Sequence, residues 1–283
     1  MSSFGIPVEH SFKRPKIAII GGSGMCTLPE IDKELYRVRP MTKYGLPSDE
    51  IRVCEYSGII IAFLPRHGSN HTIAPHRVPY KANLLALQEL GVHTIFATCI
   101  VGSLKSSITP GSLVVPNQFV NMTWGRDDYV EKDNGKFLHL PMADPYCETT
   151  RQKIIQATED CGHKVLKKGV VAVIQGPRFS TRAESLFFMH NGWDIVNMTQ
   201  YPECYLAREL GLCYGVLASV TDYDVGIESQ LAMQSSNMKD VLKIFNRNIQ
   251  NTKNVIFKFL DSYNTDMYCN CSKLEVHTYF EQK

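Results

Sequence analysis

The most constraining feature of this chain is a buried-strand pattern that ends in two carboxylates. Residues 212–218 form an uninterrupted apolar run, and Thr221-Asp222-Tyr223-Asp224 follows shortly after it. Such a run is typical of a strand covered on both faces. Ligands bind at the carboxyl ends of these strands in α/β sheets. There Asp222 and Asp224 could handle a proton and a polar group of a ligand. In the alternative interpretation, Asp222 only caps a following turn or helix.

Further apolar runs and helical patterns alternate along the chain. Strands are predicted at residues 16–20, 59–64, 94–99, 113–116, 169–174 and 194–199. Helices are predicted at residues 78–90, 148–161, 202–210 and 237–261, the last as one long amphipathic helix or two. Strand, helix and strand in succession indicate parallel βαβ units. Because no repeat or linker interrupts the pattern, we predict one α/β domain over residues 16–283, preceded by a flexible polar arm at residues 1–15.

Polar or glycine-rich residues follow six of the predicted strands. They are Ser23, Arg66-His67, Gly102-Ser103, residues 176–182, Met198-Thr199 and residues 222–224. In a mainly parallel sheet these ends gather at one edge. Their hydroxyl and cationic groups suit a phosphate. Phe179 and Met198 suit a ring and a sugar, and the two acids suit a heterocycle with N–H groups. This set indicates nucleoside chemistry, although Arg66-His67 could instead form a structural ion pair, and Phe179 and Met198 could be core residues.

Composition excludes several classes of partner. The chain has 283 residues, and 30 Lys and Arg against 28 Asp and Glu leave a net charge of +2. This balance predicts neither a nucleic-acid nor a membrane partner. No apolar run approaches the ~20 residues of a membrane span. The first fifteen residues lack the apolar core of a signal peptide, so we predict a cytoplasmic protein.

The nine cysteines include one close pair, Cys269-Asn-Cys271. Zinc would need a second close pair, and the sequence has none. His67, His71 and His76 share no helical face and have no carboxylate companion, so no metal site is predicted. Disulfides are uncommon inside cells, and the cysteines below are only candidate partners. They are Cys147, Cys204, Cys213, Cys269 and Cys271. A redox role for Cys269 and Cys271 stays open beside a stabilising or incidental one.

Several motifs in one order carry a family resemblance. They are Ile19-Ile20-Gly21-Gly22-Ser23-Gly24, Arg66-His67-Gly68 with His71-Thr72-Ile73, residues 176–184, Asn197-Met198-Thr199 with Pro202-Glu203, and Thr221-Asp222-Tyr223-Asp224. Over roughly residues 16–245 the chain resembles the 5′-methylthioadenosine phosphorylases of the purine nucleoside phosphorylase family. The resemblance implies a single α/β domain with a mixed, partly barrel-like central sheet flanked by helices. It also implies a homotrimer or homohexamer that uses inorganic phosphate and needs no metal or organic cofactor.

The resemblance also assigns site residues. Phosphate would contact Ser23, Arg66, His67 and Thr199, with main-chain help near Cys99 and Ile100. The nucleoside would contact Met198 under the ribose, Phe179 against the purine, and Asp222, Tyr223 and Asp224 at the base. His139 would reach the 5′ end of the sugar across a subunit contact, and Met238, Val241 and Leu242 would form the pocket for the methylthio group. Asp222 would be the catalytic acid.

The expected activity is the reversible phosphorolysis of 5′-methylthioadenosine to adenine and 5-methylthioribose 1-phosphate. Asp at position 222 favours a 6-amino purine, since a carboxylate repels the O6 acceptor of a 6-oxopurine. Alternatives are a broader phosphorylase of adenosine or 6-oxopurine nucleosides, and a hydrolytic nucleosidase. A nucleoside-binding or redox protein without turnover, with Cys269 and Cys271 as its working pair, is the rival from another class.

Overall fold

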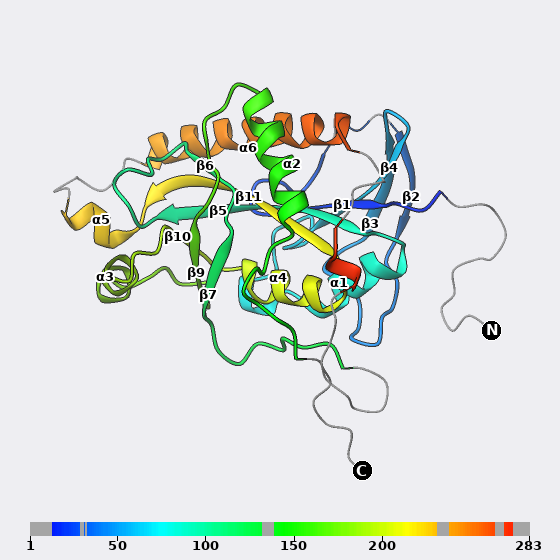
Figure 1. The fold of residues 1–283 in the computed structure, drawn as a ribbon, viewed down its shortest axis with the longest axis horizontal. Coiled ribbons are helices and arrows are strands. Elements are labelled where there is room, and N and C mark those ends of the chain that lie inside the picture. Colours follow the sequence, from blue (N-terminus) through cyan, green and yellow to red (C-terminus); the bar gives the residue numbers. More distant parts are fainter. Residues whose placement is uncertain are drawn as a thin grey trace, which may run out of the picture.

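Two long parallel strands form the centre of the molecule (Figure 1). The structure is a computed structural model and describes residues 13–28, 31, 33–131, 139–230, 238–263 and 269–273. The central strands are β5 (Thr94–Ser103) and β11 (Cys213–Tyr223). The first nine residues of β11 are buried, as expected for a strand that is covered on both faces.

The remaining strands extend from this pair as a branched, mixed sheet. On one side of β5 lie β1 (Ile17–Gly21), β4 (Ile59–Pro65), β3 (Ile51–Tyr56) and β2 (Lys33–Val38), in that order. The last residues of β5 pair with β10 (Ile195–Asn197), which continues to β9 (Val170–Ile174) and β7 (Gln118–Met122). The other edge of β11 pairs with β6 (Leu113–Val114), and β6 pairs with β8 (Val165–Leu166). Strand β5 therefore joins the separate arms of the sheet.

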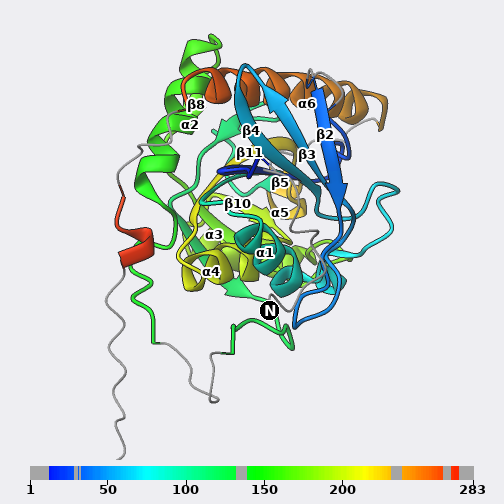
Figure 2. The same ribbon diagram turned by 90° about the vertical axis from the view of Figure 1, so that its right-hand side faces the viewer.

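Helices cover both faces of this sheet (Figure 2). Helices α2 (Glu148–Asp160) and α6 (Met238–Asp261) pack on one face, and α1 (Tyr80–Glu89) and α4 (Gln200–Glu209) on the other. Helices α3 (Arg182–His190) and α5 (Val225–Gln230) pack together beyond the carboxyl end of β11. The described residues also include the short 3₁₀ helices η1 (Pro75–Arg77) and η3 (Cys271–Lys273). The predicted single α/β domain, with a mixed sheet flanked by helices, is confirmed.

The helices pack through apolar stripes at helical spacing. Val255, Ile256 and Phe259 of α6 are buried against β1 and β5, while Leu84 and Leu87 of α1 are buried in the cluster on the opposite face. The long amphipathic pattern at 237–261 therefore forms one helix, with its polar side outward. Among the described residues, no helix has the length and apolar character that a membrane span requires.

Parts of the observed fold were absent from the predicted elements. Strands β2, β3 and β7 and helix α3 were not predicted, and the strand at 94–99 continues to Ser103. Residues 1–12 of the predicted arm 1–15 lie outside the described residues. Its described end is attached to the sheet, because Lys13 Nζ lies 3.0 Å from a carboxylate oxygen of Glu55 in β3.

Candidate active site

A cavity of about 650 Å³ lies where strand ends of the branched sheet meet. Residues that follow β1, β4, β9 and β10, together with the last residues of β5 and β11, line it. The structure therefore brings together all six polar strand ends. Of the residues expected at the site, the lining includes Ser23, Arg66, His67, Cys99, Ile100, Phe179, Met198, Thr199, Asp222, Asp224 and Leu242. We call Arg66, His67, Cys99 and Thr199 the inner wall, and Phe179, Met198 and Leu242 the outer wall.

Arg66 is fixed in the inner wall by a buried ion pair. Its Nε and Nη2 donate to the two carboxylate oxygens of Glu203, at 2.5 and 2.6 Å, and its Nη1 donates to the carbonyl of Thr98 at 2.9 Å. Burial alone would lower the pKa of Arg66, but the Glu203 carboxylate outweighs burial and raises it above its ordinary value. Tyr214 also donates to Glu203, at 2.7 Å. The guanidinium is therefore charged and rigidly oriented, and its charge is matched by its partner.

The backbone beside Arg66 approaches very closely. A Cβ built on Gly22 would lie 2.6 Å from the carbonyl oxygen of Thr98 and 3.0 Å from Nη1 of Arg66. The amide of Gly22 donates to Oγ1 of Thr98 at 3.0 Å. Glycine at this position thus lets the turn after β1 lie directly against the arginine. Ser23, the next residue, is thereby placed at the cavity.

The imidazole ring of His67 is neutral, and one of its two nitrogens forms a hydrogen bond within the chain. Its Nδ1 donates to the carbonyl of Ile73 at 2.8 Å, because that carbonyl can only accept. Burial, and after it the charge of Arg66, lowers the pKa of His67 to about 4. At neutral pH, Nε2 therefore carries a lone pair and no proton. His67 therefore offers a ligand a hydrogen-bond acceptor.

Thr199 is positioned by an asparagine at the end of β10. Oδ1 of Asn197 accepts from the amides of Thr199 and Gln200, each at 2.8 Å, and so fixes the turn that leads into α4. The Nδ2 of Asn197 donates to the carbonyl of Ile100 at 3.3 Å.

The Sγ atom of Cys99 accepts from the side-chain amide of Gln200 at 3.3 Å, and burial raises the pKa of the thiol to about 12. Cys99 is therefore a thiol with a structural partner.

The two acids at the end of β11 differ in their surroundings. Asp222 is half-buried, and one of its oxygens accepts from the hydroxyl of Thr221 at 2.5 Å. Asp224 is buried, its amide donates to the carbonyl of Ser103 at 2.8 Å, and its Oδ2 has no hydrogen-bond partner within the part of the chain that the structure describes. Burial raises the pKa of Asp224, so this carboxyl holds its proton to a higher pH than usual.

Alternation along the strand separates Tyr223 from the two acids. Its hydroxyl donates to the carbonyl of Ser106 at 3.2 Å, and the residue does not line the cavity. His139 is exposed and also lies outside the lining. The side chains of Met238 and Val241 lie outside the described residues. Substrate roles for these four residues stay predictions.

The outer wall is open, in contrast to the inner wall. Phe179 is 79% exposed and Leu242 is 52% exposed, although both line the cavity. The loop before Phe179 is held from below by Arg126, whose Nη2 donates to the carbonyls of Gln175 and Met198, each at 2.9 Å. The single chain therefore fixes the backbone next to the outer wall but leaves the side chains of Phe179 and Leu242 exposed to solvent.

Comparison with known proteins identifies the family. The model of the phosphorylase superfamily matches residues 16–261. The chain belongs to this superfamily. It is 46% identical over 253 residues to an S-methyl-5′-thioadenosine phosphorylase of Mycolicibacterium smegmatis, covering 89% of this chain and 93% of that one. It is 41% identical over 263 residues to a protein of the same name from Nitrosopumilus maritimus, covering 92% and 97%.

A solved structure extends the similarity to three dimensions. A variant of adenosine/methylthioadenosine phosphorylase from Schistosoma mansoni, in complex with methylthioadenosine, is 36% identical, with a TM-score of 0.81. The alignment covers 89% of this chain and 93% of that one. The family resemblance that the motifs carry is thereby confirmed.

Three residues that the sequence analysis does not assign to the site support the cavity of this phosphorylase superfamily protein. Glu203 pairs with Arg66, Asn197 positions Thr199, and Arg126 holds the loop beneath the outer wall. Asn197 and Glu203 lie within the motifs that carry the resemblance, which was the available signal for both. Arg126 lies in a polar stretch, and its sequence context carries no signal.

Proposed function

We propose that this chain catalyses the reversible phosphorolysis of 5′-methylthioadenosine, giving adenine and 5-methylthioribose 1-phosphate. The observation that carries the proposal is one cavity that is lined both by Arg66 and Thr199 and by Asp222 and Asp224. An anion site opposite an acid is what the replacement of a purine by phosphate requires. The names of the relatives from Nitrosopumilus maritimus and Mycolicibacterium smegmatis support the proposed substrate.

In the proposed mechanism, the two acids act on the leaving purine. The C1′–N9 bond breaks and its electron pair passes to the base. Asp222, protonated or hydrogen-bonded at N7, stabilises the negative charge that develops there, an effect typically worth ~10²–10⁴-fold in rate. Oδ2 of Asp224, which has no hydrogen-bond partner among the described residues, accepts from the 6-amino group. An amino group offers the N–H donors that a 6-oxopurine lacks at this position, so adenine is the preferred leaving group.

The inner wall acts on phosphate. Arg66 has N–H donors left after its bonds to Glu203 and Thr98, and these donate to phosphate together with the hydroxyls of Ser23 and Thr199. Backbone groups near Cys99 and Ile100 complete the set. The lone pair on Nε2 of His67 accepts the remaining P–OH hydrogen of the phosphate monohydrogen dianion. A phosphate oxygen then forms the new bond to C1′, and catalysis is mainly positioning and electrostatic stabilisation.

The outer wall receives the nucleoside. Met198 lies under the ribose, Phe179 against the purine, and Leu242 beside the methylthio group. We assign Met238, Val241 and Tyr223 to the nucleoside as well, and His139 to its 5′ end from a neighbouring subunit. No metal or organic cofactor takes part in the proposed reaction.

We also propose that the chain forms a homotrimer or homohexamer. A second cavity, of about 480 Å³, lies beside the outer wall and is lined by Met122, Trp124, Phe187 and neighbouring residues. Trp124 is 73% exposed and Phe187 is 52% exposed. Exposed aromatic side chains around one cavity are typical of a protein–protein interface, which supports contact with a second copy of the chain here. Such a copy would also cover the exposed side of the outer wall near Phe179. The cytoplasmic location stays a prediction.

The deciding experiment measures release of the free base from methylthioadenosine, with adenosine and inosine for comparison, each with and without phosphate. We expect phosphate-dependent adenine release from methylthioadenosine, with formation of the sugar 1-phosphate. Adenine release that is independent of phosphate would instead identify a hydrolytic nucleosidase. Hypoxanthine release from inosine at a comparable rate would favour the broader phosphorylase. If the enzyme turned over none of the three nucleosides, the proposal would be contradicted.

A further inference from the structure

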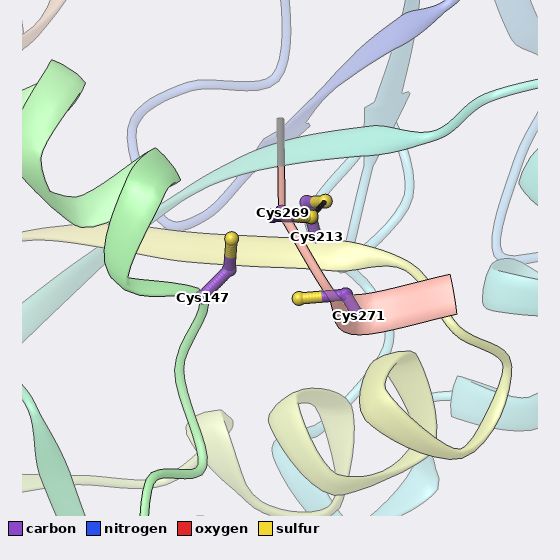
Figure 3. Close-up of side chains that lie close together, drawn as sticks. All are labelled: Cys147, Cys213, Cys269 and Cys271. Carbon is purple, nitrogen blue, oxygen red and sulfur yellow. Dashed lines mark hydrogen bonds between the residues drawn. The ribbon is translucent and has the colours of Figure 1, made fainter. Parts of the chain in front are cut away.

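Four cysteines from separate parts of the chain converge at the amino end of β11 (Figure 3). Cys147 immediately precedes α2, Cys213 begins β11, and Cys269 and Cys271 lie in the C-terminal tail. All four Sγ atoms lie within 4.8 Å of one another, and all four residues are free cysteines. Figure 3 shows the four side chains arranged around a common space between these elements.

The spacing of these sulfur atoms suits a single tetrahedral metal ion. With Zn–S bonds of about 2.3 Å, tetrahedral geometry separates the sulfurs by about 3.8 Å. The sulfur atoms of the cluster lie within 4.8 Å of one another, close enough for this separation to be reached by small side-chain movements. The sulfurs of Cys213 and Cys269 are closer, at 2.9 Å, and would open slightly around a metal ion. Four sulfur ligands in this geometry are typical of zinc.

The backbone fixes two of the ligands firmly. The amide of Cys147 donates to the carbonyl of Tyr214 at 3.0 Å, and the amide of Cys213 donates to the carbonyl of His93 at 2.9 Å. The two cysteines are therefore held beside each other by neighbouring positions of β11, and both are buried. Nδ1 of His93 lies 3.6 Å from Sγ of Cys213, where it can donate to a metal-bound thiolate.

The tail reaches the cluster through a close backbone contact. A Cβ built on Gly211, which has φ of +72°, would lie 3.3 Å from Cα of Ser272 and 3.6 Å from the carbonyl oxygen of Cys271. The described tail residues 269–273 are themselves half-buried or exposed. Burial of large apolar side chains therefore does not explain why this segment lies here, whereas a bond through its two cysteines does.

We propose that Cys147, Cys213, Cys269 and Cys271 bind one zinc ion that anchors the C-terminal tail to the body of the domain. Each thiol loses its proton to solvent as its sulfur binds the cation, and no oxidant or reductant takes part. With four protein ligands the site has no open position for substrate, so its role is structural. Asp222 lies nine residues along β11 from Cys213, about 30 Å at the usual rise per residue.

This proposal differs from the metal-free expectation of the sequence analysis. That expectation rested on the lack of a second close cysteine pair along the chain. The fold provides the missing pair from Cys147 and Cys213, which are 66 residues apart in sequence (213 − 147) and adjacent in space. The proposal is independent of the proposed phosphorolysis, because it concerns the opposite end of β11.

Zinc content measured by mass spectrometry of the purified full-length chain, after passage over a chelating resin, tests the proposal. We expect one zinc per chain. The double variant C269S/C271S should lose the ion. The matched control C26S/C161S, which removes two cysteines of similar exposure outside the cluster, should retain it. Wild-type protein without zinc would overturn the proposal, whether its four thiols are free or joined in disulfides, and so would zinc retained by C269S/C271S.

A second measurement on the wild-type protein does not depend on the folding of any variant. Titration with an organic mercurial should release zinc in step with the modification of four thiols per ion. Cobalt exchanged into the site should give the intense absorption of tetrahedral thiolate coordination. Zinc released without thiol modification, or an octahedral cobalt spectrum, would contradict the cysteine site.

Discussion

The inner and outer walls of the cavity are built in opposite ways. Arg66 is 1% exposed and pairs with the buried Glu203, whereas Phe179 is 79% exposed and lies in the loop between β9 and α3. Buried, hydrogen-bonded groups hold one geometry without a ligand, and exposed apolar groups gain from being covered. The contrast indicates that one chain preorganises the anion side of its site, while the nucleoside side needs a ligand or a second copy to complete it.

The largest expected effect tests the rigidity of the inner wall. Glu203→Gln leaves the Arg66 guanidinium buried without its counter-charge, which should cost about 3–5 kcal/mol of unfolding free energy. Urea unfolding measures this change. Glu184→Gln is the matched control, because Glu184 also forms a two-point pair with an arginine, Arg178, but at an exposed site. Equal effects in the two variants would contradict a special role for the buried pair.

Asp222→Ala tests the proposed catalytic acid, which lines the cavity but belongs to neither wall. We expect kcat to fall at least about a hundredfold while the fold is retained, because stabilisation of the leaving base is lost. Steady-state kinetics and circular dichroism measure the two quantities. Asp160→Ala, at the exposed end of α2, should leave kcat unchanged. Near-normal turnover of the Asp222 variant would remove this residue from the mechanism, and Asp224→Asn would then be the next variant to measure.

A smaller effect concerns the pH dependence of the inner wall. The pKa of His67 is about 4 in the folded chain and about 6.5 when unfolded, so unfolding takes up a proton between these values. Its stabilising contribution is present above about pH 6.5 and is lost as the pH falls toward 4. Between about pH 8 and pH 5.5 the loss should be about 1 kcal/mol.

His67→Asn tests this assignment by urea unfolding across the same pH range. An asparagine amide can still donate to the carbonyl of Ile73, but it does not titrate. The variant should therefore lose less stability than the wild type as the pH is lowered. Identical pH profiles for the two proteins would show that His67 does not titrate as described.

The smallest effect among the variants is expected at the outer wall. Phe179→Ala should raise KM for the nucleoside by roughly 2–10-fold, the value of one aromatic contact, with kcat nearly unchanged. Tyr129→Ala removes another exposed aromatic side chain that does not line the cavity, and it should not alter KM. A fall in kcat as large as that of Asp222→Ala would mean that the outer wall also fixes the reacting geometry.

Local patterns predicted the centre of this fold but not its edges. Strands β1, β4, β5 and β11 are continuous apolar runs, which are visible in one dimension. Strands β2 and β3 pair antiparallel at one side of the sheet, and charged residues such as Lys33, Glu34 and Arg52 obscure their pattern. Helix α3 begins with a capping box of Thr181 and Glu184, which is a sequence signal for the start of a helix.

The candidate site shows the same division. The lining residues could be predicted because each follows its own strand, and strand ends gather at one edge. The partners of those residues could not be derived from spacing. Arg66 and Glu203 are 137 residues apart, and the tautomer of His67 depends on a carbonyl that only the folded loop supplies. Sequence indicated which groups meet, while the charge and proton that each carries depend on the fold.

The pairing of Arg66 with Glu203 has a consequence for how the cavity attracts its anion. The two charges cancel at contact distance, and His67 is neutral at physiological pH, so these three residues together contribute no net charge. A phosphate dianion would be held by the orientation of N–H and O–H dipoles and would feel little long-range attraction from them. Mobile ions screen attraction between separated net charges far more than contacts between fixed dipoles and a bound ion. The affinity for phosphate should therefore change little with ionic strength.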